Sequence, residues 1–110
     1  MNDTTKKYLY DIKKSVDSIT IHLGGINNFK LFSGNLTVKR AVERELEIIG
    51  EAMTHLLSVG PEIKIADAKK IIAMRNRIIH GYDSVDDAVV WNVVIKSLPV
   101  LKGDVAKLLE

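Results

Sequence analysis

An amphipathic segment over residues 35–59 constrains the fold more than any other part of the sequence. Asn35 is suited to cap its start, and Gly60-Pro61 is suited to end it. Its charged residues share one side, whereas its apolar residues cover too wide an arc for a single contact face. We therefore expect a helix that packs against more than one neighbour, through Val38, Ala41, Val42, Ile48, Ile49, Ala52, Met53, Leu56 and Leu57.

Helical periodicity also precedes this segment, from about Thr4 to His22. Apolar residues recur there at alternating spacings of three and four, which places them on one stripe of a helix. Asp3 or Thr4 is expected to cap the start, and Gly24-Gly25 weakens or ends the helix. The connector over residues 26–35 has room for one helical turn. The stripe consists of Leu9, Ile12, Val16, Ile19 and Leu23.

The second half of the chain predicts further helices. One is expected from near Ile65 to His80-Gly81, with its core side formed by Ala68, Ile71, Ile72, Ile78 and Ile79. Another covers residues 85–98, and Ser84 with Asp87 has the spacing of a capping box at its start. Pro99 should kink this helix or start a separate last one. Together these segments predict an all-α, four-to-five-helix up-and-down bundle that forms a single domain over residues 1–110.

Composition supports this fold and excludes several classes of function. The chain has 110 residues with Gly 7 and Pro 2, too few turn residues for a many-stranded sheet. It has no cysteine, which excludes disulfides, thiolate metal sites and a cysteine nucleophile. The charged N-terminus does not resemble a signal peptide, and no apolar run reaches the length of a membrane span. We expect a soluble, cytoplasmic protein, and its net charge of +2 neither supports nor excludes a nucleic-acid substrate.

The stretch "MRNRIIHGYD", residues 74–83, gathers polar side chains suited to phosphate chemistry. Histidine titrates near neutrality, so His80 could move a proton to or from a ribose hydroxyl. Arg75 offers a permanent charge to the oxygens of a phosphorane-like transition state. Asn76 could orient His80 or bind a phosphate oxygen, and Tyr82 offers a stacking face and a hydroxyl. This set suits phosphodiester cleavage without a metal or another cofactor.

Helix geometry limits how these residues could meet. Arg75 and His80 are five positions apart, so on an ideal helix they point about 140° away from each other. We therefore expect His80 in a distorted last turn, with Arg75 reaching across and Gly81 bringing Tyr82 back over the same helix end. On spacing alone, a solvated helix face with a histidine near its C-terminus is the favoured interpretation.

Other polar or conspicuous residues have simpler explanations. His22 and His55 lie on different predicted helices without acidic or cysteine partners at ligand spacing, so we expect helix-face histidines rather than a metal site. Trp91 is expected to anchor the core or an interface. Gly50 lies in mid-helix, where close backbone packing would compensate its low helix propensity. Glu51 is expected on a helix face or in a dimer contact, and Lys13-Lys14 on the solvated surface.

Three motifs in order resemble the HepT-like branch of the HEPN superfamily (higher eukaryotes and prokaryotes nucleotide-binding domains). "RNRIIHGYD" is similar to the branch's R-N-x-x-x-H-x-Y signature, and "RAVERELEIIGEA" to its second-helix motif ending in "IGEA". "VWNVVIKSLPVLKGDV" resembles its final helix with a tryptophan and a Leu-Pro step. Together the motifs cover about residues 36–106.

This resemblance implies a specific function. HepT-like proteins are dimeric helical bundles in which two motifs face one cleft. Many are ribonuclease toxins paired with a minimal nucleotidyltransferase antitoxin (MntA-like), which adenylylates the motif tyrosine. Carried over by position, Arg75 and His80 are the catalytic pair, Asn76 is the polar residue after the arginine, and Tyr82 is the modification site. Asp83 departs from the aromatic or apolar residue common after that tyrosine, and its charge would weaken RNA binding or alter partner recognition.

These observations lead to one main hypothesis and two alternatives. The main hypothesis is a homodimeric, metal-independent endoribonuclease toxin of a type VII-like toxin–antitoxin module, with RNA as substrate and a nucleotidyltransferase as partner. One alternative is a non-catalytic subunit that presents a nucleotide or substrate to the nucleotidyltransferase. The other is a dimeric helical interaction module whose motif has lost activity.

Overall fold

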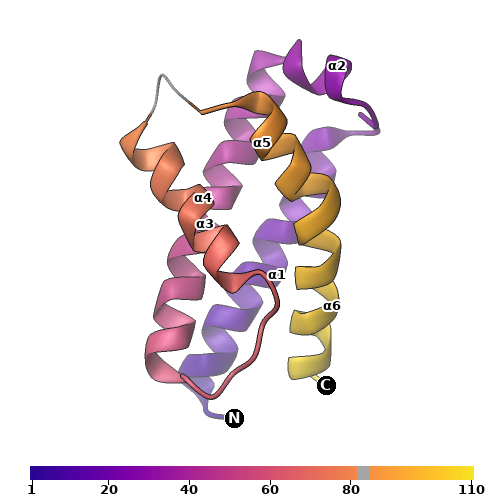
Figure 1. Ribbon diagram of the computed structural model, residues 1–110. Coiled ribbons are helices and arrows are strands. Elements are labelled where there is room, and N and C mark those ends of the chain that lie inside the picture. The colour runs from indigo at the N-terminus through magenta and orange to yellow at the C-terminus, as the bar shows by residue number, and fades with distance from the viewer. Residues whose placement is uncertain (82–84) are drawn as a thin grey trace.

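The computed structural model describes residues 1–81 and 85–110 and confirms the all-α bundle (Figure 1). The two long helices, α1 (Asp3–Leu23) and α3 (Leu36–Val59), form the most extensive packing contact, and α4 (Ala68–His80) packs on another side of α3. The short helix α2 (Phe29–Ser33) lies at the end of the bundle away from both termini (Figure 1). Along the C-terminal part, α5 (Asp87–Asn92), a π-helical turn (Val93–Ser97) and α6 (Leu98–Leu108) follow one another directly.

Asparagine side chains cap the first three helices. Asn2 Oδ1 accepts a hydrogen bond from the Thr5 backbone N–H at 2.8 Å, so the expected caps Asp3 and Thr4 are wrong by one or two residues. Asn35 caps α3 as predicted, through the Val38 N–H at 3.1 Å. These side chains satisfy backbone donors that a helix start leaves without partners.

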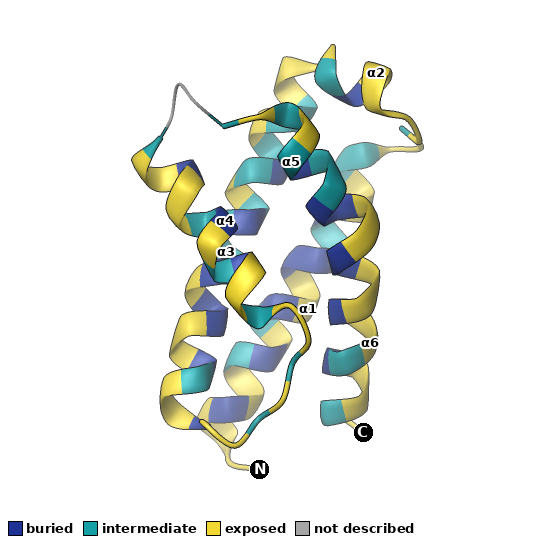
Figure 2. Cartoon of the chain, viewed as in Figure 1, coloured by how far each residue is buried: buried dark blue, intermediate teal, exposed yellow. Residues whose placement is uncertain are grey.

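The central position of α3 follows from its wide apolar arc. Figure 2 shows buried positions along most of its length, facing the other helices. Leu46, which is 1% exposed, was not among the expected core residues, and Ile48, which was, is only half-buried. The side chains or backbone of α3 that are buried against its neighbours belong to Val42, Leu46, Ile49, Gly50, Ala52, Met53 and Leu56.

The connection from α3 to α4 is longer than expected, because the predicted helix start near Ile65 is wrong. Ile65 is half-buried and packs on the core from a non-helical segment. Asp67 then adopts a left-handed conformation, with φ of 61°, which an α-helix cannot continue through. The Asp104 carboxylate of α6 accepts a hydrogen bond from the Ala66 N–H at 3.0 Å. Tertiary contacts therefore hold this segment in a non-helical conformation, and α4 begins only at Ala68.

The C-terminal helices accommodate Pro99 through the π-helical turn. Pro99 lies in the first turn of α6 and has no N–H to donate to the preceding turn. The Leu98 N–H bonds to the Val93 carbonyl, the wider i→i−5 pattern. The chain bends here without interruption, as Figure 1 shows. Asp86 caps α5 through the Ala88 N–H at 2.8 Å, whereas the capping role predicted for Ser84 lies outside the described residues.

Side-chain contacts between helices complete the bundle. Trp91 is half-buried and stacks at a tilt on the buried Phe32, with ring centroids 5.0 Å apart, which confirms its expected role as a core anchor. Asp87 accepts hydrogen bonds from both Ser33 at 2.9 Å and Lys39 at 3.0 Å, which connects α5 to α2 and α3.

Within residues 1–81 and 85–110, no helix is both long and apolar enough to cross a bilayer.

Candidate functional site

The motif residues lie on the second half of α4. Ile71, Met74 and Ile78 are buried at spacings of three and four, and they fix which side of α4 faces the core. Ile79, expected in the core, is 39% exposed. On the remaining surface Arg75 is half-buried, while Asn76 and His80 are exposed. Core packing on one side of α4 therefore fixes the orientation of the helix, and the motif residues lie on the rest of its surface.

Arg75 leaves α4 where this helix crosses α3. Its first side-chain carbons lie against Gly50, which explains why the residue is half-buried. Its Nη1 donates a hydrogen bond to Asn76 Oδ1 at 3.0 Å. Asn76 therefore contacts its neighbouring arginine. Its expected contact with His80 or with a phosphate oxygen stays a prediction. The guanidinium keeps further donors that can bind a planar oxyanion.

His80 is the last residue of α4, and the helix is regular up to it. The Gly81 N–H bonds to the Arg77 carbonyl at 2.9 Å, which continues the α-helical pattern. The expected distorted last turn is therefore wrong. In a regular helix Arg75 and His80 diverge by about 140° and differ by about 7.5 Å along the axis. One copy of α4 presents the two side chains in different directions.

Tyr82, Asp83 and Ser84 lie outside the described residues. Gly81 is the C-cap of α4, with φ of −132° and ψ of 52°, so the chain leaves the helix directly before Tyr82. The roles assigned to Tyr82 and the effect expected of Asp83 therefore stay predictions.

The charge of α4 differs sharply from that of the chain as a whole. The helix contains Lys69, Lys70, Arg75 and Arg77, and its sequence has no aspartate or glutamate. Three of these cations are exposed, and the ion pairs found within residues 1–81 and 85–110 do not involve α4. The chain has a net charge of +2, so the positive charge is concentrated on this helix. Such a surface attracts polyanions.

A groove of about 260 Å³ lies between the first half of α3 and the end of α4. Desolvation by burial raises the pKa of Glu43 above its ordinary value of 4.5, while Arg40 opposes this shift. Arg44 Nη1 contacts Glu47 Oε2 at 2.8 Å on the same helix. From the sequence, the charged residues of this segment were expected only to share one side of the helix. The groove is lined by Arg40, Glu43, Arg44, Glu47, Ile78 and Val85.

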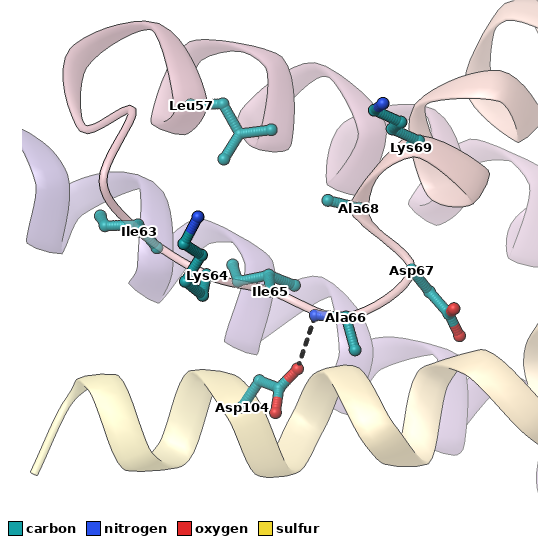
Figure 3. A pocket seen from close by; sticks show the side chains of 9 residues that line it. All are labelled: Leu57, Ile63, Lys64, Ile65, Ala66, Asp67, Ala68, Lys69 and Asp104. Carbon is teal, nitrogen blue, oxygen red and sulfur yellow. Dashed lines mark hydrogen bonds between the residues drawn. The ribbon is translucent and has the colours of Figure 1, made fainter.

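A larger hollow, of about 580 Å³, lies at the opposite end of α4 (Figure 3). Its apolar wall consists of Leu57, Ile63, Ile65 and Ala68, and Asp104 closes one side through its hydrogen bond to the Ala66 N–H. Figure 3 shows Lys64 and Lys69 beside this wall. Arg75 and His80 do not line this hollow, so volume alone does not identify the candidate site.

The remaining histidines have structural contacts. His22 Nε2 lies 2.9 Å from Glu45 Oε2 and connects α1 to α3, an acidic partner that linear spacing did not predict. The His55 ring stacks on Tyr8 with centroids 5.4 Å apart, and its Nε2 is 4.0 Å from the exposed Glu51. Among residues 1–81 and 85–110, no cluster of three or more His, Cys, Asp or Glu residues could hold a metal ion.

Comparison with known proteins places these features in a family. The sequence model of the family described as "Ribonuclease HepT-like" matches residues 12–108. "Probable ribonuclease HepT" from Thermococcus cleftensis is 35% identical over 112 residues, covering 98% of each chain. "Putative RNase TTE0752" from Caldanaerobacter subterraneus subsp. tengcongensis is 32% identical, covering 97% of this chain and 96% of that protein.

A further relative is "Putative RNase MJ1216" from Methanocaldococcus jannaschii, which is 31% identical and covers 96% of this chain and 87% of its own. No solved structure matches the chain significantly. The family match spans most of the helical bundle and contains the whole of α3 and α4, the two helices that meet at Arg75. The chain therefore belongs to the ribonuclease HepT-like family.

Proposed function

We propose that this chain is a metal-independent endoribonuclease and the toxin of a type VII-like toxin–antitoxin module. Relatives that cover nearly all of the chain carry ribonuclease names. The observation that carries the proposal is the charge of α4, which has four lysines and arginines, no acidic residue, and no ion pair within the described part of the chain. RNA phosphates are the matching ligand, because they neutralise such a surface and release counterions.

The proposed reaction is an internal transesterification of RNA. His80 takes the proton of a ribose 2′-hydroxyl as its oxygen attacks the adjacent phosphorus. The new P–O2′ bond forms and the P–O5′ bond breaks, and the departing O5′ receives a proton. The products are a 2′,3′-cyclic phosphate and a 5′-hydroxyl, so no water is consumed. Arg75 stabilises the charge that develops on the phosphoryl oxygens.

The regular geometry of α4 favours a site shared by two copies of the chain. Arg75 and His80 diverge by about 140° on one helix, so a single scissile phosphate does not lie between them. In a two-fold dimer, Arg75 of one copy and His80 of the other would face each other across one cleft. We therefore propose a homodimer in which each active site takes one residue from each copy.

Regulation is proposed to act on Tyr82. The chain leaves α4 at Gly81, so the next residue lies close to His80 along the sequence. A cognate minimal nucleotidyltransferase would add a nucleotide to the Tyr82 hydroxyl. The added phosphate would repel the RNA backbone and the added bulk would block it. Intact-mass spectrometry after co-expression should detect an adenylyl addition on wild type and none on Tyr82→Phe.

The same divergence of Arg75 and His80 favours one rival function. A subunit that binds a nucleotide or RNA and presents it to the nucleotidyltransferase needs the basic surface of α4, yet it does not need the two side chains to converge. Such a subunit would retain RNA in a binding assay without cutting it.

The deciding experiment mixes two inactive subunits. Purified wild type should cut total RNA in the presence of a chelator and leave cyclic phosphate ends. Arg75→Ala and His80→Ala should each be inactive alone. After the two variants exchange subunits, each mixed dimer would regain one complete site, which restores up to about a quarter of wild-type activity.

Three outcomes would each contradict a part of this proposal. Without any recovery in verified mixed dimers, the shared site is wrong. If wild type binds RNA but leaves it intact under all conditions in which it is folded, the chain is the binding subunit instead. Cutting that disappears with the chelator would exclude the metal-independent mechanism.

A further inference from the structure

α3 and α4 approach each other closely at Gly50. This residue lies in the middle of α3 and is buried, although glycine is unfavourable in a helix interior. A Cβ atom built on Gly50 would overlap Arg75 Cβ and lie 2.8 Å from Arg75 Cγ. It would also lie 3.4 Å from the Ile71 backbone oxygen. Glycine is therefore required here by the helix that carries the motif.

The contact at Gly50 involves an atom of Arg75 that side-chain rotation cannot move. Cβ is bonded directly to the backbone, so Arg75 cannot rotate it away from an obstacle on α3. A side chain at position 50 would have to push that part of α4 outward or twist it. The absence of a side chain at Gly50 thus sets how deeply the base of Arg75 sits against α3.

Arg75 is held at the other end of its side chain as well. Its Nη1 donates to Asn76 Oδ1 at 3.0 Å. Across the contact, Thr54 Oγ1 donates to the Gly50 carbonyl at 3.0 Å, so α3 itself carries an additional bond at the crossing point. The base and the tip of Arg75 therefore each have a fixed neighbour.

We propose that Gly50 is a positioning residue for Arg75. It does not touch RNA. It determines the distance between α3 and α4 at the Cβ of Arg75. It thereby sets the position of the guanidinium relative to the scissile phosphate. The consequence for cleavage rests on the function proposed above, whereas the placement of Arg75 does not.

The test replaces Gly50 by alanine and compares it with a matched glycine. Gly103 also lies inside a helix, α6, but a Cβ there would meet nothing within 4 Å. Gly50→Ala should lower kcat at least about ten-fold while KM changes less than about three-fold, because the exposed cations of α4 stay in place. Gly103→Ala should retain the wild-type kcat and KM.

A spectroscopic readout separates positioning from a general loss of folded protein. The side-chain Nε–Hε correlation of Arg75, assigned by its disappearance in Arg75→Lys, should shift in Gly50→Ala and stay unchanged in Gly103→Ala. This measurement remains informative even if wild type cuts no RNA, so failure of the proposed function and failure of the positioning role are distinguishable.

Wild type provides a check that needs no variant. Nuclear Overhauser contacts should connect the Gly50 α protons with the β and γ protons of Arg75, and their absence would overturn the proposal even if Gly50→Ala does not fold. An unchanged Arg75 correlation in folded Gly50→Ala would also overturn it. So would cleavage that falls only in proportion to the folded fraction, with kcat per folded molecule unchanged.

Discussion

The neighbouring helices α3 and α4 use charged residues in opposite ways. α3 contains both carboxylates and cations and several are paired, as in Arg44–Glu47 and in the Lys39 contact to Asp87. In α4, every charged side chain is basic, and the ion pairs within the described residues do not include it. Internal pairing reduces the charge that α3 presents to a ligand, whereas α4 leaves its charge available. We therefore expect α3 to contribute mainly to stability and α4 mainly to ligand contact.

Loss of the His80 side chain should abolish most RNA cleavage and leave the fold intact. His80→Ala should lower RNA cleavage by about 100- to 10,000-fold, because a proton-transfer group is lost. The residue is exposed at the end of α4, so thermal unfolding should occur within a few degrees of wild type. Cleavage of a defined oligonucleotide and circular dichroism melting measure the two quantities. Undiminished cleavage would remove His80 from the mechanism.

A core substitution in α3 should, in contrast, lower the stability of the protein. Leu46 is 1% exposed, so Leu46→Ala leaves a cavity and should lower the free energy of unfolding by about 2–5 kcal/mol. Ile79 on α4 is 39% exposed, and Ile79→Ala should lower it by no more than about 1 kcal/mol. Urea unfolding followed by tryptophan fluorescence measures both. Equal losses would contradict the burial of Leu46 and the exposure of Ile79.

Removal of one cation from each helix tests the electrostatic contrast directly. Arg77→Ala should weaken RNA binding several-fold and reduce the salt dependence of binding by about 0.7 log units per log unit of salt. Arg44→Ala should change both less, because Arg44 already contacts Glu47 at 2.8 Å. Filter binding or fluorescence anisotropy over a salt series provides the slopes. A larger change for Arg44 would reverse the assignment.

Glu43 should make a small contribution to the pH dependence of stability. Burial raises the pKa of Glu43 above 4.5, so the folded state holds this proton more strongly than the unfolded state. Stability attributable to this group is therefore present at low pH and falls as pH rises through the interval above 4.5. Glu43→Gln should remove that fall. Melting temperatures between pH 4 and 7 measure it, and parallel profiles for both proteins would contradict the assignment.

Sequence reasoning predicted most of the fold because burial follows helical periodicity. The span of α3, its Asn35 cap and the one-turn helix α2 were all predictable from local patterns. Ile65 misled the prediction, because an apolar residue at helical spacing can equally pack from a loop. Met74 is a buried residue that was not predicted, because it stands directly before a run of polar residues.

The candidate site was less predictable, because its geometry depends on contacts between helices. A close approach at Gly50 was expected, yet the sequence did not indicate that its partner would be Arg75. That pairing depends on how α3 and α4 cross, which no pattern within either helix specifies. The hydrogen bond from Arg75 to Asn76 depends in turn on which rotamer this crossing permits. The roles of Arg75, His80 and Tyr82 in catalysis and regulation stay predictions.

The hydrogen bond from the Ala66 N–H to Asp104 joins two residues that are synthesised at different times. Ala66 lies just before α4, whereas Asp104 lies in α6, 38 residues later in the chain. A ribosome therefore finishes α4 well before it makes the residue that holds the connection leading into it. During that interval α4 has its contacts with α3 but lacks this one from the last helix. The restraint that α6 places on the connection into the motif-bearing helix thus depends on a residue that is made late in synthesis.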